Sequence, residues 1–260
     1  MTNGGDGINL TFAGALAGEN NGLGANNSFF GYSAGRSNTD YGNNSFFGSL
    51  SGFSNTFGIS NSFFGSQAGY SNISGFGNSF YGHNSGAVNT SGAYNSFFGT
   101  GSGGSTTGGD GNAFFGSGAG AGNVSGGINS FFGFRAGFNT TGTGNVFVGS
   151  LAGEVNTTGT DNTAIGNHAG SAFGLTNLTN ATSIGANTSA TQSNSVILGS
   201  NASVGIGTTA PKAKLEVAGG NIFIGSPGQG IVLKSPDGAT CRLLSINNAG
   251  ATALTAIACP

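Results

Sequence analysis

Two adjacent aromatic residues recur along the chain, each pair preceded by small polar residues and followed by glycine, as in NSFFG at residues 27–31. Of the eleven steps between successive closing glycines, eight are 17 residues long, and the others are 16, 19 and 14 residues long. A regular period near 20 residues predicts a solenoid in which each repeat is one coil stacked on the next. The closing glycines are Gly14, Gly31, Gly48, Gly65, Gly82, Gly99, Gly116, Gly133, Gly149, Gly166, Gly185 and Gly199.

The repeats are predicted to be β-structure. Each one carries several Gly and Asn residues and no apolar stripe with a period of 3.6 residues, which disfavours helices. Each copy predicts a short strand at NSFFG, a Gly turn, a second short extended piece and an Asn/Gly turn. Stacking in register places equivalent residues about 4.8 Å apart, so that Asn above Asn can form amide ladders. We therefore expect an all-β parallel β-roll, or β-solenoid, of about twelve coils over residues 9–203, after a lead-in at residues 1–8.

The two aromatic residues of each copy form two columns. Neighbouring side chains of a strand point to opposite faces, so one column fills the coil and the other faces outward. An outward column left bare exceeds the apolar patch that a monomer usually exposes. We therefore expect copies of the same chain to cover it, as a parallel homotrimer with the stripes on its axis. The alternative is a monomeric solenoid wide enough to hold both rings, with a bulge that turns them the same way.

The columns differ after Gly149. The first continues as Ala164, Ser183 and Ile197, whereas the second stays apolar. The stricter column is predicted to be the coil interior, and consists of Phe30, Phe47, Phe64, Tyr81, Phe98, Phe115 and Phe132. The looser column is predicted to be the oligomer interface, and consists of Phe29, Phe46, Phe63, Phe80, Phe97, Phe114 and Phe131.

One column varies within the otherwise strict repeat, nine positions after the Asn of each NSFFG copy. Its candidate ligand-binding residues are Arg36, Phe53, Tyr70 and Phe138. Aromatic faces flanked by Asn and Ser suit sugar binding through stacking and hydrogen bonds. The alternative is that these side chains pack on the neighbouring coil or chain.

The period breaks after residue 203. Residues 221–260 alternate or run apolar between turns at SPGQG, SPDG and NNAG, which predicts a small β meander beyond the segment 204–220. The two cysteines, Cys241 and Cys259, both lie here. Pairing of their strands would bring them within disulfide reach, which would imply an oxidising compartment. Two buried thiols are the alternative.

Three segments resemble parts of known families. NSFFGSQAGYSNISG and NSVILGSNASV resemble the head repeats of trimeric autotransporter adhesins, and VGIGTTAPKAKLEVAGG at residues 204–220 looks like the connector of phage tail fibres and related bacterial surface fibres. The resemblance implies a trimeric parallel β-roll and an extracellular fibre segment that binds a cell-surface or glycan receptor. The 17-residue copies are longer than is usual for the adhesin family. The chain also shows no heptad stalk, membrane anchor or basic neck, which favours a tail fibre or secreted fibre over a complete autotransporter.

The low charge of the chain argues against nucleic acid and anionic lipid as partners. Charged residues are 5% of the chain and its net charge is −2, so no basic patch exists for nucleic acid or for anionic lipid. No apolar run approaches the roughly 20 residues of a membrane span. The opening MTNGGDGINL has no signal-peptide pattern, so the export route is not readable.

No constellation for catalysis, metal or cofactor binding emerges. GIGTTA at residues 205–210 matches a dinucleotide fingerprint, but Pro211 prevents the helix that must follow. GGDGIN at residues 4–9 lacks the Asp that calcium-binding nonapeptides carry at the sixth position, and His83 and His168 lie five coils apart. We expect that this protein is not an enzyme. An ice-binding solenoid is the alternative function, favoured by Thr39, Thr56, Thr90 and Thr157 but weakened by Ile73 and Val124 in the same column.

Overall fold

The computed structural model describes residues 8–171 and 177–259. The chain divides into two compact units, Met1–Ala202 and Ser203–Pro260. The described residues form strands, turns and loops and contain no helix. The predicted lead-in lies outside the described residues except for Ile8.

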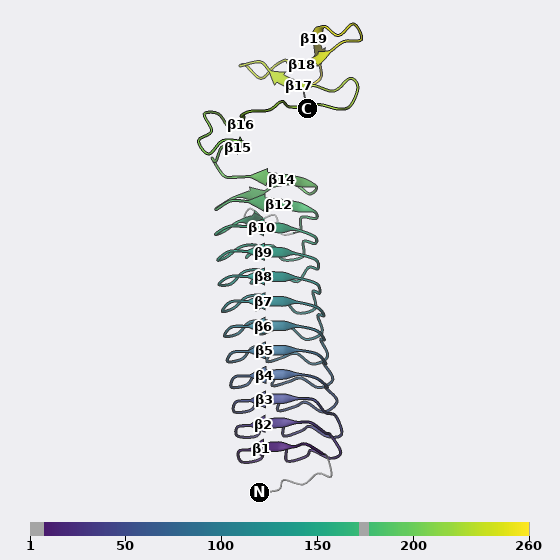
Figure 1. Ribbon diagram of the computed structural model, residues 1–260, viewed down its shortest axis with the longest axis vertical. Coiled ribbons are helices and arrows are strands. Elements are labelled where there is room, and N and C mark those ends of the chain that lie inside the picture. Colours follow the sequence, from purple (N-terminus) through teal and green to yellow (C-terminus); the bar gives the residue numbers. More distant parts are fainter. Residues whose placement is uncertain (1–7, 172–176, 260) are drawn as a thin grey trace. The chain divides into compact units, whose positions relative to one another are not determined.

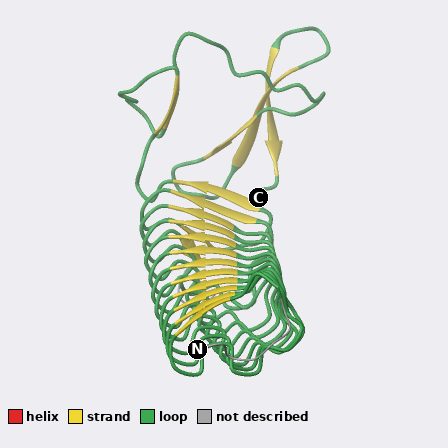
Figure 2. Cartoon of the chain, turned by 60° about the horizontal axis from the view of Figure 1, so that its bottom comes forward, coloured by secondary structure: helices red, strands yellow, loops and turns green. Residues whose placement is uncertain are grey.

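The first unit is a parallel β-solenoid, as predicted. Figure 1 shows its strands stacked in chain order, and Figure 2 shows them lying along one side of the solenoid, with turns and loops forming the rest of each coil. Twelve strands form one sheet in the order β1 to β10, β12 and β14. They are β1 (Thr11–Ala13), β2 (Ser28–Phe30), β3 (Ser45–Phe47), β4 (Ser62–Phe64), β5 (Ser79–Tyr81), β6 (Ser96–Phe98), β7 (Ala113–Phe115), β8 (Ser130–Phe132), β9 (Val146–Val148), β10 (Thr163–Ile165), β12 (Ala181–Ile184) and β14 (Ser195–Leu198).

The second extended piece expected in each coil is mostly absent from the described residues. It is a strand only at β11 (Gly170–Ser171) and β13 (Ser189–Ala190), which pair in parallel. In the other described coils the chain curls through turns, because positions such as Ser33 and Gly35 take left-handed φ angles of 53° and 58°. Its N–H groups bond alternately within the coil and to neighbouring coils. Among the bonds to neighbouring coils, the Ser33 N–H donates to the Ala15 carbonyl of the coil before, and the Gly35 N–H donates to the Ser51 carbonyl of the coil after.

The column assignment made from the sequence is wrong: the two aromatic columns are exchanged. Rings of the first column, such as Phe29 and Phe97, have 0% exposed surface and form the coil interior. The second column, predicted to be the interior, lies on the outer face of the sheet. The fully buried rings are Phe29, Phe46, Phe63, Phe80, Phe97, Phe114, Phe131 and Phe147.

A buried asparagine two residues before each interior ring explains this arrangement. Asn27 and Phe29 lie on the same side of their strand, because side chains alternate along it. The Asn27 amide points inward, where it donates to Asn21 Oδ1 of its own coil and to the Tyr41 carbonyl of the next coil. The second ring, Phe30, is therefore turned outward. A strict column was thus evidence of repeated packing and not of burial.

Each interior ring lies directly against a glycine of its own coil. A Cβ on Gly35, which has a φ of 58°, would lie 2.6 Å from the Phe29 ring. The glycine that closes each strand is required for a different reason. Gly31 has a φ of 135°, and a Cβ there would lie 2.5 Å from the carbonyl oxygen of Gly48 in the next coil.

Two buried asparagine columns link successive coils. One, here called the strand asparagines, precedes the strands: Asn27, Asn44, Asn61, Asn78, Asn95, Asn112, Asn129, Asn145 and Asn162. The other, the turn column, contains Asn21, Asn38, Asn55, Asn72, Asn89, Thr106, Asn123, Thr140 and Asn156.

The turn column contains the predicted amide ladder. The side-chain amides of Asn38, Asn55, Asn72 and Asn89 each donate to the Oδ1 of the asparagine one coil earlier, at 2.6–2.9 Å. The ladder is interrupted at Thr106, whose side chain is shorter. Asn89 Oδ1, Thr106 Oγ1 and both amide atoms of Asn123 are buried there without a hydrogen-bond partner.

The second unit contains a parallel pair, β15 (Val204–Ile206) and β16 (Leu215–Val217), within the predicted connector. A three-stranded antiparallel sheet follows, with β17 (Ile231–Lys234), β18 (Cys241–Ile246) and β19 (Thr252–Ile257) in chain order. This sheet is the predicted meander.

The predicted disulfide between Cys241 and Cys259 is present, with the two Cα atoms 5.1 Å apart. It ties the start of β18 to the chain just beyond β19. In the turn before β18, hydrogen bonds from the Ser235 hydroxyl and then from the Ala239 N–H hold the pKa of the Asp237 carboxyl below its usual value.

Candidate functional site

The outer face of the twelve-stranded sheet carries a continuous apolar ladder, here called the outer stripe. Successive aromatic side chains in it are nearly parallel, with ring centres 4.6–4.9 Å apart and planes within 9° of each other. The ladder continues past the last ring, where Val148, Ile165, Ile184 and Leu198 are 38–47% exposed. The outer stripe comprises Phe30, Phe47, Phe64, Tyr81, Phe98, Phe115, Phe132, Val148, Ile165, Ile184 and Leu198.

Stacking decides what the outer stripe can bind. Each ring of the outer stripe between its two end rings has both faces covered by the rings of the coils before and after it, so it presents its edge outward. A ring edge carries partial positive charge and the face partial negative charge. A sugar that stacks needs an accessible face, which the outer stripe does not offer along its length. Ring edges and aliphatic side chains do suit packing against another apolar protein surface.

The candidate ligand residues on the variable column contact their neighbours. Phe53 and Tyr70 stack on each other with ring centres 5.2 Å apart. Arg36 lies 5.9 Å from the centre of the Phe53 ring and forms a 2.6 Å ion pair with Glu19. The column therefore packs from coil to coil over these turns, as the alternative interpretation expected.

Phe138 is engaged in a similar way. The guanidinium carbon of Arg135 lies 4.1 Å from the centre of its ring, and the same side chain pairs with Glu154 at 3.2 Å. Both ion pairs join residues of adjacent coils. Arg36 and Arg135 are each 39% exposed, so the pairs add little stability individually.

A second group of exposed apolar side chains was not predicted from the sequence. It occupies the loops that lead into four successive strand asparagines and is here called the loop cluster: Tyr41, Phe57, Ile59, Ile73, Phe76 and Tyr94, which are 38–65% exposed. Its rings meet edge to face, with interplanar angles of 84° for Tyr41 and Phe57 and 79° for Phe76 and Tyr94. The sequence did contain a signal, because no other loop of the repeat carries an aromatic residue at these positions.

Three of the threonines that suggested ice binding donate their hydroxyls to the backbone. Thr39 and Thr90, like Thr107 in the same column, donate to the carbonyl of the equivalent residue in the next coil at 3.0–3.1 Å, and Thr56 donates to the Ser54 carbonyl at 3.0 Å. These hydroxyls stabilise the stack, and their protons are not directed at solvent. No observation thus favours the ice-binding alternative.

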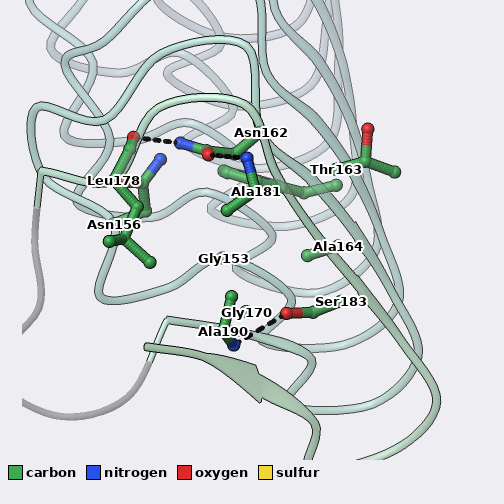
Figure 3. Close-up of a pocket in the computed structure, with 11 residues that line it drawn as sticks. Gly153, Asn156, Asn162, Thr163, Ala164, Gly170, Leu178, Ala181, Ser183 and Ala190 are labelled. Atoms are coloured by element: carbon green, nitrogen blue, oxygen red, sulfur yellow. Dashed lines mark hydrogen bonds between the residues drawn. The ribbon is translucent and has the colours of Figure 1, made fainter. Parts of the chain in front are cut away.

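The interior changes where the phenylalanine column ends. Ala164 and Ser183 follow Phe147 in register, leaving a cavity of about 20 Å³ (Figure 3). The Asn162 amide spans one side of it, donating to the Leu178 carbonyl and accepting from the Ala181 N–H, while Ser183 Oγ accepts from the Ala190 N–H. A cavity of this size holds about one water molecule, so it is part of the packing and too small for a ligand.

The second unit exposes most of its apolar side chains. Within residues 203–259, Cys241 is the only side chain that is fully buried. A hollow of about 590 Å³ lies between residues 222–231 and the segments Leu244–Ile246 and Thr252. Phe223 at its margin is 91% exposed.

Titratable residues do not gather into a site in the part of the chain that the structure describes. No three His, Cys, Asp or Glu side chains there are placed to hold a metal ion. The described residues also include no helix that could cross a membrane. Comparisons with protein-family models, with curated proteins and with solved structures gave no match to this chain.

Proposed function

We propose that this chain is a structural and adhesive segment of an extracellular fibre, assembled from parallel copies of itself, with a homotrimer as the expected assembly. The observation that carries the proposal is the outer stripe: eleven apolar side chains, one per coil, whose rings present edges to solvent. At about 4.8 Å per coil the stripe runs for roughly 50 Å. A continuous apolar stripe of this length is larger than the exposed apolar patches that the surface of a monomeric protein normally carries.

The second unit supports the same proposal independently. A unit of this size with so few buried apolar side chains has little hydrophobic core to stabilise it. Packing against the equivalent units of other copies would bury Phe223 and its apolar neighbours. Each unit has its own uncovered apolar surface. In a parallel assembly each unit packs against the same unit of the other chains, so both surfaces are covered, which is the arrangement of a closed cyclic oligomer.

The interior of the solenoid suits a structural role in a fibre. The stacked rings, the asparagine columns and the backbone bonds between coils repeat along the first unit, so each coil is held by both neighbours. The disulfide of the second unit is consistent with an oxidising, extracellular environment. The sequence resemblance to adhesin heads and tail-fibre connectors supports an adhesive role.

Mass measurement in solution tests the assembly. Light scattering of the full chain is expected to give three times the chain mass of 25.2 kDa. The double variant Phe64→Asp/Phe115→Asp places carboxylates on the outer stripe, where burial and mutual repulsion in the interface are costly, and it is expected to be monomeric with its β-signal retained. The matched control Val88→Asp/Val124→Asp, at residues 39% and 46% exposed on other parts of the coil, is expected to assemble normally. A wild-type monomer at micromolar concentration would overturn the proposal.

A further inference from the structure

We propose that the loop cluster, Tyr41, Phe57, Ile59, Ile73, Phe76 and Tyr94, is a binding site for a neutral oligosaccharide. The inference deepens the proposed adhesive function and rests on it, because it assigns the receptor class and the part of the fibre that binds it.

The loop cluster is a local feature of a repetitive protein. It covers the loops before Asn44, Asn61, Asn78 and Asn95, whereas the equivalent loops elsewhere hold Gly, Ser, Thr, Ala, Asp, Asn, Leu, Val or Ile. The solenoid therefore forms without aromatic side chains at these positions. An interface between copies of this chain would draw on features that recur on every coil, as the outer stripe does. Four turns of exposed rings instead fit a ligand of limited length.

The ring geometry differs from that of the outer stripe in the way that matters for sugars. In an edge-to-face pair, the ring that contributes its edge keeps its faces clear of its partner. Tyr94 is 65% exposed and Phe57 is 53% exposed. Tyr94 packs over Gly77 of the preceding coil, where a Cβ would lie 3.1 Å from Tyr94 Cδ1. Glycine thus makes room for this ring against the surface of the coil.

The chemistry of the loops favours an uncharged partner. Among residues 39–43, 56–60, 73–77 and 90–94, Asp40 is the only charged one, and its Oδ1 accepts from the Leu23 N–H at 3.0 Å. A polyanion would find no opposite charge there to offset its desolvation, and a polycation would find one carboxylate, Asp40, which already accepts a backbone hydrogen bond. Ser60, Ser74 and Ser91 are exposed in the same loops. Aromatic faces with a few hydroxyls beside them match the C–H faces and hydroxyl edges of a neutral sugar chain.

The test uses the full-length protein, with its mass first measured by light scattering. Wild type is probed on an array of neutral oligosaccharides (cello-, chito-, manno- and xylohexaose) beside sialylated and sulfated oligosaccharides. We expect binding to at least one neutral probe. Tyr94→Ala and Phe76→Ala should each weaken that binding by about tenfold or more, because each removes one stacking ring. Tyr94→Phe should stay within about threefold of wild type, because it keeps the ring.

Two controls separate the loop cluster from exposed apolar residues in general. Tyr32→Ala removes a 54% exposed ring outside the cluster, and Ile128→Ala removes a 72% exposed side chain from the same loop position as Tyr94, two coils further on. Both should bind as wild type. The proposal is overturned if no neutral probe binds, if only charged probes bind, or if binding survives both Tyr94→Ala and Phe76→Ala. It is also overturned if these two variants lose oligomeric mass, because the cluster is then an interface between copies. An oligomer that binds no neutral probe leaves the fibre proposal standing, whereas a monomeric wild type overturns that proposal whatever the array shows.

Discussion

Phe97 and Phe98 are consecutive residues of β6, and their rings lie on opposite sides of the same sheet. Phe97 has no exposed surface and stacks between Phe80 and Phe114 at 4.8 Å inside the coil. Phe98 stacks between Tyr81 and Phe115 at 4.6–4.7 Å on the outside. The two rings thus belong to similar ladders with different surroundings: one fills the coil, and the other forms the outer stripe that we propose as the interface between copies.

Substituting these two residues separates the ladders. Phe97→Ala is expected to lower the free energy of unfolding by about 3–5 kcal/mol, because the flanking coils cannot close the cavity without losing register. Phe98→Ala removes a half-buried ring and is expected to cost the coil only about 1 kcal/mol, mainly through lost stacking. Denaturant unfolding measures both in the Phe64→Asp/Phe115→Asp background, which is expected to be monomeric, so that loss of the interface between copies does not add to the cost of Phe98→Ala. Equal losses, or a larger loss for Phe98→Ala, would contradict the assignment of the columns.

Restoring the interrupted amide ladder is expected to stabilise the solenoid. In Thr106→Asn, the new amide can donate to Asn89 Oδ1 and accept from the Asn123 amide, as the asparagines of earlier coils do. Giving partners to buried polar atoms should raise the free energy of unfolding by about 1–2 kcal/mol. Thermal and urea unfolding test this, with the exposed neighbour Ser105→Asn as the control, for which little change is expected. A lower midpoint for Thr106→Asn than for wild type would show that the gap has no room for the longer side chain.

The strand asparagines should be intolerant of substitution. Asn95 Nδ2 donates to the Gly109 carbonyl at 2.8 Å, and its Oδ1 accepts from the Asn112 backbone N–H at 2.9 Å. Asn95→Ala leaves both partners buried without this amide and is expected to cost about 2–5 kcal/mol.

Asn95→Asp should add a pH dependence. An introduced carboxyl is buried against the Gly109 carbonyl, so its pKa is raised above the unfolded-state value. The folded state then binds more protons than the unfolded state, and the stability of the variant falls as pH rises between the two values. Unfolding midpoints measured from pH 4 to pH 8 should recover towards the acid end. Ser125→Asp, at an exposed loop position, should show much less dependence, and similar profiles for the two would argue against a buried Asn95.

The disulfide is expected to stabilise the second unit alone. Replacing both Cys241 and Cys259 with Ser removes a cross-link between residues 18 apart in sequence, which should cost about 3 kcal/mol. Hydrogen exchange should accelerate in β17, β18 and β19 and stay unchanged in the solenoid, because the cross-link lies within the second unit. Thiol titration of the denatured, unreduced protein should find no free thiol, and two titrating thiols would refute the bridge.

The sequence by itself determined the fold class, the coil length, the amide ladder, the meander and the disulfide. Its 17-residue period is a statement about register: when every coil has the same length, equivalent residues must stack. Recurrent glycines marked the positions where Cβ atoms cannot fit, as Gly31 and Gly35 show. Periodicity fixes the coil length, the amide ladder and the glycine positions because these depend only on which residues are equivalent. The meander and the disulfide lie outside the repeat, and were predicted from local alternation and from the positions of the two cysteines.

Only the tertiary structure decided which ring of each pair is inside and which exposed rings share a surface. Alternation along β6 requires Phe97 and Phe98 to face opposite ways, and it is equally consistent with either direction. The choice depended on where the Asn95 amide finds its partners, and these are buried backbone groups of the next coil, the Gly109 carbonyl and the Asn112 N–H. The loop cluster likewise brings together Tyr41, Phe57, Phe76 and Tyr94, which are separated in the chain by most of a coil or more. Stacking places them side by side because coils in register bring residues one period apart within one strand spacing of each other.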